Sequence, residues 1–211
     1  MSQYPFSAVL LAAGSSSRMQ GRCKQLLPIP AAQGDIPAVR ATAQALLASG
    51  AQEVVVVTGF RSREVVAVLG DLPVTIQANP RYEDGQMTSV TAGLSALHRP
   101  CSAIMVCLAD VVLVEAEDYR LLAEEFAVLP ADAILVPHQG ETRGNPVVFA
   151  SSRVPEILAG TLNPGCRRLI AEHPDQVVRR EFEHDRFVRD MDTPEDYDRI
   201  CARLRQRHQS E

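Results

Sequence analysis

Short apolar runs recur along the chain, and segments of helical periodicity separate them. The runs are apolar almost throughout, which is typical of strands buried on both faces. They lie at Ala8–Leu11, Glu53–Thr58, Val74–Ala78, Ala103–Leu108 and Ala133–Val136. Apolar residues spaced by three and four predict helices at Val39–Ala48, Arg61–Leu69, Thr88–Leu97 and Glu117–Phe126. This alternation predicts a parallel sheet with crossover helices.

The pattern becomes less regular after Gly140. It predicts a strand at Pro146–Phe149, helices near Val154–Leu158 and Cys166–Glu172, and a last helix from Pro194 that Thr193 caps. No internal repeat or long linker divides the chain. We therefore expect an α/β fold that is Rossmann-like and doubly wound, with a mostly parallel sheet, helices on both faces and a single domain over residues 1–211. Ligands of such sheets bind beyond the carboxyl ends of the strands.

Composition narrows the possible functions. A net charge of -5 offers no basic surface for a phosphate backbone, so nucleic acid is not an expected partner. The five cysteines are scattered and form no C-x-x-C pair, which favours a reducing cytosol and argues against structural zinc. No apolar run approaches the ~20 residues of a membrane span. We expect a soluble cytoplasmic protein with no membrane partner.

The loop after the first strand carries the first chemical signal. It reads L-A-A-G-S-S-S-R-M from Leu11 to Met19, and Lys24 follows. Backbone N–H groups of small residues can approach phosphate oxygens, while Arg18 and Lys24 add positive charge. The loop matches neither G-x-x-x-x-G-K-[ST] nor G-x-G-x-x-G. From these residues alone, a triphosphate site and an ordinary flexible loop with solvated basic side chains remain equally open.

Together, five elements identify the resemblance. The run L-A-A-G-x-S-x-R-M with a downstream K-x-L-L-P resembles the MobA-like nucleoside triphosphate transferases. Asn79–Val90 is similar to the N-P-x-Y-x-x-G-x-x-[TS]-S-V element of molybdenum cofactor cytidylyltransferases. Val57–Arg61, Gly144–Pro146 and Asp190–Asp196 match further elements in the family order. Because independent motif errors multiply, five matches carry far more weight than one.

The resemblance implies a nucleotide-binding part at about residues 5–110 and an acceptor and metal part at about 111–200. It implies that Arg18 and Lys24 stabilise the breaking triphosphate and, in the empty site, face solvent. The expected nucleotide-binding residues are Leu11, Ala12, Ala13, Gly14, Ser15, Arg18, Lys24, Thr58, Gly59, Asn79, Gly85 and Ser89. Each of the residues in the loops after the second and third strands, from Thr58 to Ser89, could by itself also be explained by a role in a turn or a helix cap.

Asp110 follows the fourth strand, where the resembled family has its metal-binding aspartate. Carboxylate and phosphate oxygens suit Mg²⁺. Relatives have Gly and Pro where this chain has Ala109 and Val112, so the loop can differ in shape from theirs. The alternative is that Asp110 is a plain loop aspartate without a metal role. Asp190 and Asp192 are expected on one face of a last short strand, where one of them supplies a second metal ligand. Their alternative role is electrostatic support of the following helix.

The family resemblance implies Mg²⁺-dependent nucleotidyl transfer with Asp110 as the third catalytic residue beside Arg18 and Lys24. A phosphate on the acceptor attacks the α-phosphorus of the triphosphate and pyrophosphate leaves. The expected acceptor is the phosphorylated pterin of the molybdenum cofactor, and a molybdenum hydroxylase would receive the product. Ala13 favours CTP, because guanylyl members carry Gly there. The alternatives are GTP, another phosphorylated acceptor, or a non-catalytic protein that delivers finished cofactor.

Overall fold

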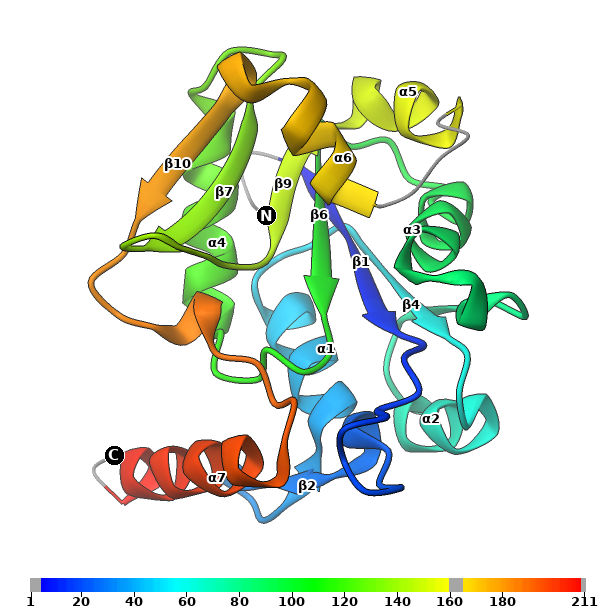
Figure 1. Ribbon diagram of the computed structural model, residues 1–211, viewed down its shortest axis with the longest axis vertical. Coiled ribbons are helices and arrows are strands. Elements are labelled where there is room, and N and C mark those ends of the chain that lie inside the picture. The colour runs from blue at the N-terminus through cyan, green and yellow to red at the C-terminus, as the bar shows by residue number, and fades with distance from the viewer. Residues whose placement is uncertain (1–4, 160–164, 210–211) are drawn as a thin grey trace.

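The computed structural model describes residues 5–159 and 165–209. Within them a mixed sheet of eight strands runs in the order β10-β7-β9-β6-β1-β4-β5, with β8 paired to β7 (Figure 1). Its strands are β1 Phe6–Ala12, β4 Glu53–Thr58, β5 Thr75–Ala78, β6 Ala103–Leu108, β7 Ile134–Gln139, β8 Thr142–Arg143, β9 Val147–Ala150 and β10 Val177–Glu181. Parallel pairs join β6, β1, β4 and β5, whereas β9 runs antiparallel to β6 and β7. The predicted doubly wound, mostly parallel α/β fold is confirmed.

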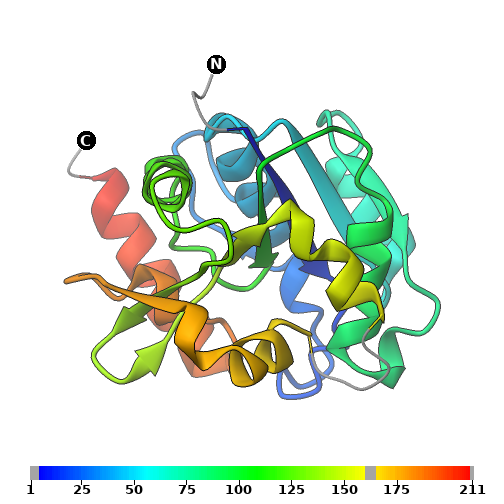
Figure 2. The same cartoon turned by 90° about the horizontal axis from the view of Figure 1, so that it is seen from above.

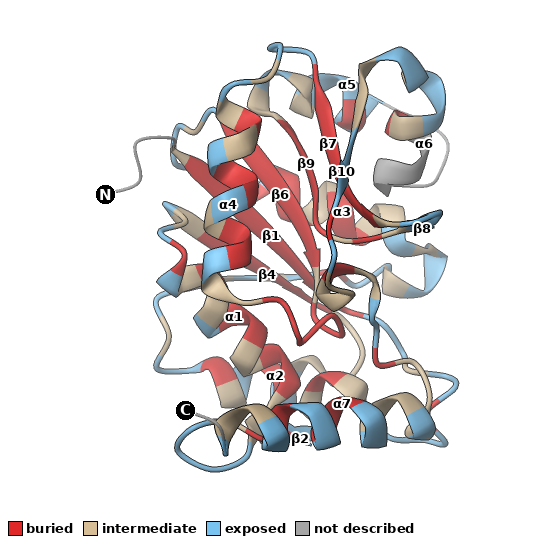
Figure 3. Cartoon of the chain, turned by 90° about the vertical axis from the view of Figure 1, so that its left-hand side faces the viewer, coloured by how far each residue is buried: buried red, intermediate tan, exposed pale blue. Residues whose placement is uncertain are grey.

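Helices cover both faces of the sheet (Figure 2). One face carries α1 Ala38–Ala48, α2 Ser62–Leu69 and α4 Ala116–Ala127, and the other carries α3 Gln86–Ser95, α5 Val154–Ala159 and α6 Gly165–Glu172. Strand β1 divides its side chains between them: Ala8 and Leu10 join the first core, Val9 and Leu11 the second. Figure 3 shows buried residues concentrated in the central strands and on the helix surfaces that face them. This two-sided burial explains why the central strands read as unbroken apolar runs.

The last helix lies beside the carboxyl ends of the strands. Helix α7, Pro194–His208, starts with the predicted cap: the Thr193 hydroxyl accepts from the Asp196 N–H at 3.2 Å. Its apolar residues form a third core with Ile29 and Leu113. A hairpin of β2 Pro28–Ile29 and β3 Ile36–Pro37 joins this core. The C-terminal segment is thereby held beside the loops that follow β1 and β6. None of the helices within residues 5–159 and 165–209 is long and apolar enough to cross a membrane.

The structure departs from the predicted elements at its edge strand, its two-residue strands and the segment before α7. Strand β10 has no long apolar run, because it is an edge strand whose sequence V-V-R-R-E ends in exposed charged residues. The β2–β3 hairpin and β8 have two-residue strands that fall below the length at which alternation is visible. The prediction that Asp190 and Asp192 lie on a strand is wrong, since the segment between η5 (Arg186–Val188) and α7 is irregular.

Candidate active site

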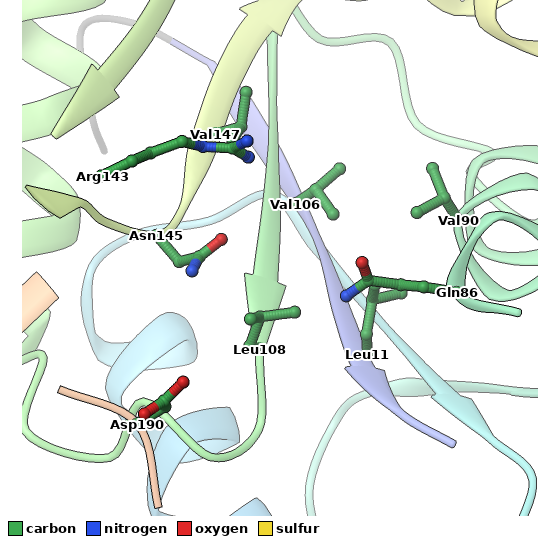
Figure 4. A pocket seen from close by; sticks show the side chains of 9 residues that line it. All are labelled: Leu11, Gln86, Val90, Val106, Leu108, Arg143, Asn145, Val147 and Asp190. Atoms are coloured by element: carbon green, nitrogen blue, oxygen red, sulfur yellow. The ribbon is translucent and has the colours of Figure 1, made fainter. Parts of the chain in front are cut away.

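Two adjoining pockets lie at the carboxyl ends of β1 and β6. The first, about 200 Å³, is formed by the loop after β1, the start of α3 and the loop after β6. Its lining residues are Leu11, Ala13, Gly14, Lys24, Gln25, Tyr82, Gln86, Ser89, Leu108, Ala109 and Asp110. The second, about 350 Å³, shares Leu11, Gln86 and Leu108 with the first and extends toward β8 and β9 (Figure 4). The two therefore form one continuous cleft.

The loop after β1 closes one side of the first pocket. It is anchored at one end by the Phe60 N–H, which donates to the Ala13 carbonyl at 3.1 Å, and in the middle by the fully buried Met19. Gly14 and Ser15 are exposed, and among the described residues their N–H groups donate to no protein acceptor. The loop thus offers backbone donors at the pocket edge, as an anion site requires.

A lysine ammonium joins two carboxylates on the other side of this loop. The Lys24 Nζ donates to Asp110 Oδ2 and, at 2.9 Å, to Asp192 Oδ1. Arg18 Nη2 lies 2.5 Å from Asp192 Oδ2. The prediction that Lys24 faces solvent is wrong: its side chain is 15% exposed, against 68% for Arg18, because the two carboxylates draw it inward. Burial acts to lower the Lys24 pKa, but Asp110 and Asp192 outweigh it and the pKa is raised, so the ammonium stays charged.

A backbone hydrogen bond brings the carboxylates of Asp110 and Asp192 together. The Met191 N–H donates to the Asp110 carbonyl at 3.0 Å, and the Met191 side chain is fully buried in the third core. Because Met191 points inward, the carboxylates on either side of it point outward. Asp192 meets Lys24 and Arg18, whereas Asp190 lines the second pocket (Figure 4). Of the two acids, Asp192 is the one that shares a partner with Asp110.

The carboxyl of Asp190 lies in a different electrostatic environment from that of Asp192. The cleft walls strip part of its hydration, and the nearby carboxylates of Asp192 and Asp110 repel its charge. Both effects raise the pKa of Asp190, although the residue remains open to solvent. The cleft therefore concentrates three negative groups around one lysine, an arrangement that favours an incoming cation.

The donor set fits a metal ion that arrives with phosphates. In the part of the chain that the structure describes, no group of three or more His, Cys, Asp or Glu is arranged to hold a metal by itself. Asp110 and Asp192 offer two carboxylates, and Mg²⁺ is typically bound by one or two carboxylates together with substrate phosphates and water. Lys24 now neutralises both carboxylates, so a metal ion would bind them only after the ammonium had moved away.

Of the other predicted nucleotide-binding residues, several have their side chains engaged within the protein. The Thr58 hydroxyl hydrogen bonds with that of Ser62 at 2.7 Å and is fully buried. Asn79 donates to the hydroxyls of Thr88 and Ser89 at 2.8 and 2.9 Å. The first contact joins the end of β4 to α2, and the other two hold the loop after β5 against α3. Their predicted roles toward nucleotide stay predictions, and of Thr58, Asn79 and Ser89 only Ser89 lines the first pocket.

Ala12 and the two predicted glycines shape the same region. Ala12 ends β1 fully buried in the first core. Gly85 has φ 112° at the start of α3, a backbone conformation that favours glycine. A Cβ on Gly59 would lie 2.7 Å from the Tyr82 Cβ and 2.9 Å from the Ala13 Cβ. The close packing of Gly59 thus lets the Tyr82 ring and Ala13 form one wall of the pocket.

The comparison with protein families decides the class. A model described as the MobA-like NTP transferase domain matches residues 8–177. The chain belongs to this family. It is therefore a nucleotidyltransferase by family, and its expected substrate class is a nucleoside triphosphate. The resemblance stated from the sequence is confirmed.

Individual relatives are more distant. The nicotine blue oxidoreductase of Paenarthrobacter nicotinovorans is 27% identical over 206 residues, which cover 92% of this chain and 95% of that protein. A nucleotidyl transferase from Methanothermobacter thermautotrophicus superposes with a TM-score of 0.82 at 22% identity, covering 96% and 99% of the two chains. A Mycobacterium tuberculosis protein in complex with manganese gives 0.74 at 21% identity over 94% and 98%. These structures agree with the family fold.

Sequence reasoning missed several residues of this transferase cleft. Gln25, Tyr82 and Gln86 line the first pocket, and Arg143 and Asn145 line the second. Most of them sit inside the quoted motifs: Gln25 occupies the variable position of K-x-L-L-P, and Asn145 that of G-x-P. Gln25, Gln86 and Asn145 occupy variable positions, which carry no family signal, whereas Tyr82 is the fixed Tyr of the Asn79–Val90 element and could have been singled out.

Proposed function

We propose that this chain transfers CMP from CTP to a phosphorylated acceptor with the help of Mg²⁺. The observation that carries the proposal is the Lys24–Asp110–Asp192 cluster beside a loop with open backbone donors. A cation between two carboxylates is the charge pattern that a metal–triphosphate complex replaces. Family membership supplies the reaction class.

On this proposal the protein supplies alignment and charge rather than a nucleophile. The Gly14 and Ser15 N–H groups bind phosphate oxygens, and Lys24 leaves its carboxylates to neutralise the triphosphate. Arg18, exposed at the cleft edge, closes over the leaving pyrophosphate. Mg²⁺ held by Asp110 and Asp192 would screen the charge between donor and acceptor. An acceptor phosphate oxygen forms a bond to the α-phosphorus while the bond to the bridging oxygen breaks, and pyrophosphate leaves with the electron pair.

The second pocket supports a flat heterocyclic acceptor. Its floor is apolar, built from the side chains of strands β1, β6 and β9, and polar groups of Gln86, Arg143, Asn145 and Asp190 surround it (Figure 4). A volume of about 350 Å³ is within the range of small-molecule sites. An apolar floor with amide and guanidinium donors at its rim suits a pterin that carries a phosphate. We therefore keep the phosphorylated pterin of the molybdenum cofactor as the proposed acceptor.

The narrow first pocket supports CTP as the donor. Ala13 and Tyr82 line this pocket, and its volume of about 200 Å³ is smaller than that of the second pocket. A pyrimidine needs less room than a purine. We expect CTP to be used at least about tenfold better than GTP, which corresponds to about 1.4 kcal/mol. Pyrophosphate release with each nucleotide, Mg²⁺ and molybdenum cofactor measures this ratio. Equal use of both nucleotides would remove the cytidylyl assignment and leave the transferase class intact.

Asp110→Asn tests the metal carboxylate. The change keeps the side-chain shape but removes the charge, so turnover should fall by orders of magnitude. Metal-free CTP affinity should stay similar or rise, because a carboxylate repels an unshielded triphosphate. Asp192→Asn should behave in the same way and Asp190→Asn more mildly. Near-normal Mg²⁺-dependent turnover of Asp110→Asn would place the metal elsewhere.

A second candidate follows from the relative named an oxidoreductase, which aligns with most of this chain. Hydride transfer has no need of a lysine held between two carboxylates, so we place this candidate second. Oxidation of NADH or NADPH by the protein, with no consumption of nucleoside triphosphate, would reverse that order. Binding of finished cofactor without pyrophosphate release would instead favour a delivery protein.

A further inference from the structure

Gln25 is a polar side chain buried beneath the loop that follows β1. It is 2% exposed and comes directly after Lys24. Its amide nitrogen donates to the Gly14 carbonyl at 3.1 Å. Its amide oxygen accepts from the Ser16 hydroxyl at 3.2 Å and from the Cys23 thiol at 3.0 Å. One side chain thus contacts both the beginning and the end of the loop.

Ser16 continues this network to the catalytic lysine. Its hydroxyl, which donates to Gln25, also accepts from the Lys24 N–H at 3.0 Å. Ser16 has φ 55°, in the left-handed region that residues with a side chain rarely adopt. Such a conformation persists only where the surroundings hold it. Gln25 and the Lys24 N–H are the two groups that hold the Ser16 hydroxyl.

The hydrogen bonds of the Gln25 side chain all go to other residues of the same loop. An amide oxygen accepts two hydrogen bonds, and both of those of Gln25 come from within the loop. Its amide nitrogen holds the carbonyl of Gly14, the residue whose N–H we place on the phosphates. Gln25 therefore fixes where the N–H groups of Gly14 and Ser15 point and where Lys24 begins.

We propose that Gln25 is a positioning residue that holds the loop from Gly14 to Lys24 in its phosphate-binding shape. The inference rests on the proposed function, since it assumes that this loop binds a triphosphate. A loop that is already shaped loses less conformational freedom when the phosphates bind. Loss of Gln25 should therefore weaken recognition of the triphosphate and leave recognition of the base unchanged.

The experiment compares the binding of CTP and of cytidine by calorimetry in wild type, Gln25→Met and Ser16→Ala. Methionine keeps the length of the side chain and removes all three hydrogen bonds. We expect CTP to bind about tenfold more weakly to Gln25→Met, while cytidine affinity changes by less than about twofold. Ser16→Ala, which leaves Gln25 in place, should weaken CTP in the same sense. The double variant should be little worse than Gln25→Met alone, because both residues act in one network.

Ser49→Ala is the matched control. The Ser49 hydroxyl is also buried and donates to the Leu46 carbonyl at 2.6 Å, at the far end of α1. Its loss should leave CTP affinity unchanged. Unaltered CTP affinity in both Gln25→Met and Ser16→Ala, or equal losses for CTP and cytidine, would overturn the inference. Wild-type protein that binds no nucleoside triphosphate would contradict the proposed function itself, so the two failures are distinguishable.

Discussion

Replacing Lys24 by methionine should destabilise the empty protein and make its carboxylates available to metal. Methionine keeps the apolar stem and removes the ammonium. Asp110 and Asp192, whose side chains are 11% and 18% exposed, would then face each other without a cation. Repulsion between two poorly hydrated carboxylates is the source of the expected effect.

The magnitude follows from how deeply the cluster is buried. Removing one partner of a fully buried ion pair costs about 3–5 kcal/mol, and an exposed pair contributes at most about 1 kcal/mol. Lys24 is 15% exposed, which places it between these limits. We expect the free energy of unfolding to fall by about 2 kcal/mol, and the melting temperature by about 6 °C for a chain of this size.

The pH dependence has a defined sign. Because the folded-state pKa of Lys24 is raised, its contribution is fully present below the ordinary lysine pKa of about 10.4 and is lost as pH rises through the folded value. In Lys24→Met the penalty comes from two charged carboxylates.

Two assays check this prediction. Thermal unfolding between pH 7 and 11 measures the stability difference, and Mn²⁺ titration without nucleotide measures metal affinity. Metal no longer has to displace an ammonium, so Lys24→Met should bind Mn²⁺ about tenfold more tightly. Arg22→Met, which removes an exposed cation from the same loop, is the control and should alter neither quantity. A wild-type melting temperature together with unchanged Mn²⁺ affinity in Lys24→Met would refute the counter-ion role.

Three further variants test other parts of the account. Arg18→Ala should shift the melting temperature by less than about 2 °C, because the side chain is 68% exposed, yet lower kcat/KM for CTP at least about tenfold; early melting at normal activity would instead indicate a structural ion pair. Asp190→Asn should raise the melting temperature at pH 7. Because the folded-state pKa of Asp190 is raised, its protonated form gives stability that is fully present below about pH 3.9 and is lost as the pH rises. The difference in melting temperature between wild type and Asp190→Asn should therefore vanish in acid. Gly93→Ala should cost about 1–3 kcal/mol of stability by overpacking α3 against β1 and β4, since its Cβ would press on Val9 and lie 2.8 Å from Val57 Cγ2. Activity per folded molecule should stay normal in that variant, and an unchanged melting temperature would show that the strands yield.

The fold was predictable where burial is two-sided. Strands β1, β4 and β6 lie between helices, and their sequences are apolar runs of strand length. Strand β10 lies at an edge with two half-buried valines followed by charged residues, so its sequence does not differ from that of a loop. The segment from Asp190 to Asp192 shows the same limit. Alternating residues predict a strand, but the single buried residue there, Met191, anchors an irregular segment.

The sequence indicated which acids lie near Lys24, but it did not indicate which of them form ion pairs with it. The order of the motifs predicts that Lys24 and Asp110 lie near the acids at positions 190 and 192, and the structure places them at one cleft. The ion pairs between residues 24, 110 and 192 depend on long-range packing around Met191, which leaves no local signal in the sequence. For the same reason Lys24 was expected in solvent. Polar residues such as Asn79 gave no sign of whether they face a ligand or a neighbouring helix.

The proposed reaction breaks the bond between the α-phosphorus of a nucleoside triphosphate and its bridging oxygen. Phosphorus NMR of a reaction with CTP, Mg²⁺ and molybdenum cofactor tests this most directly, because it separates the possible products. We expect pyrophosphate and a CMP-linked acceptor in equal amounts, both absent with Asp110→Asn. Formation of CDP and inorganic phosphate, or a spectrum of unreacted CTP alone, would contradict it.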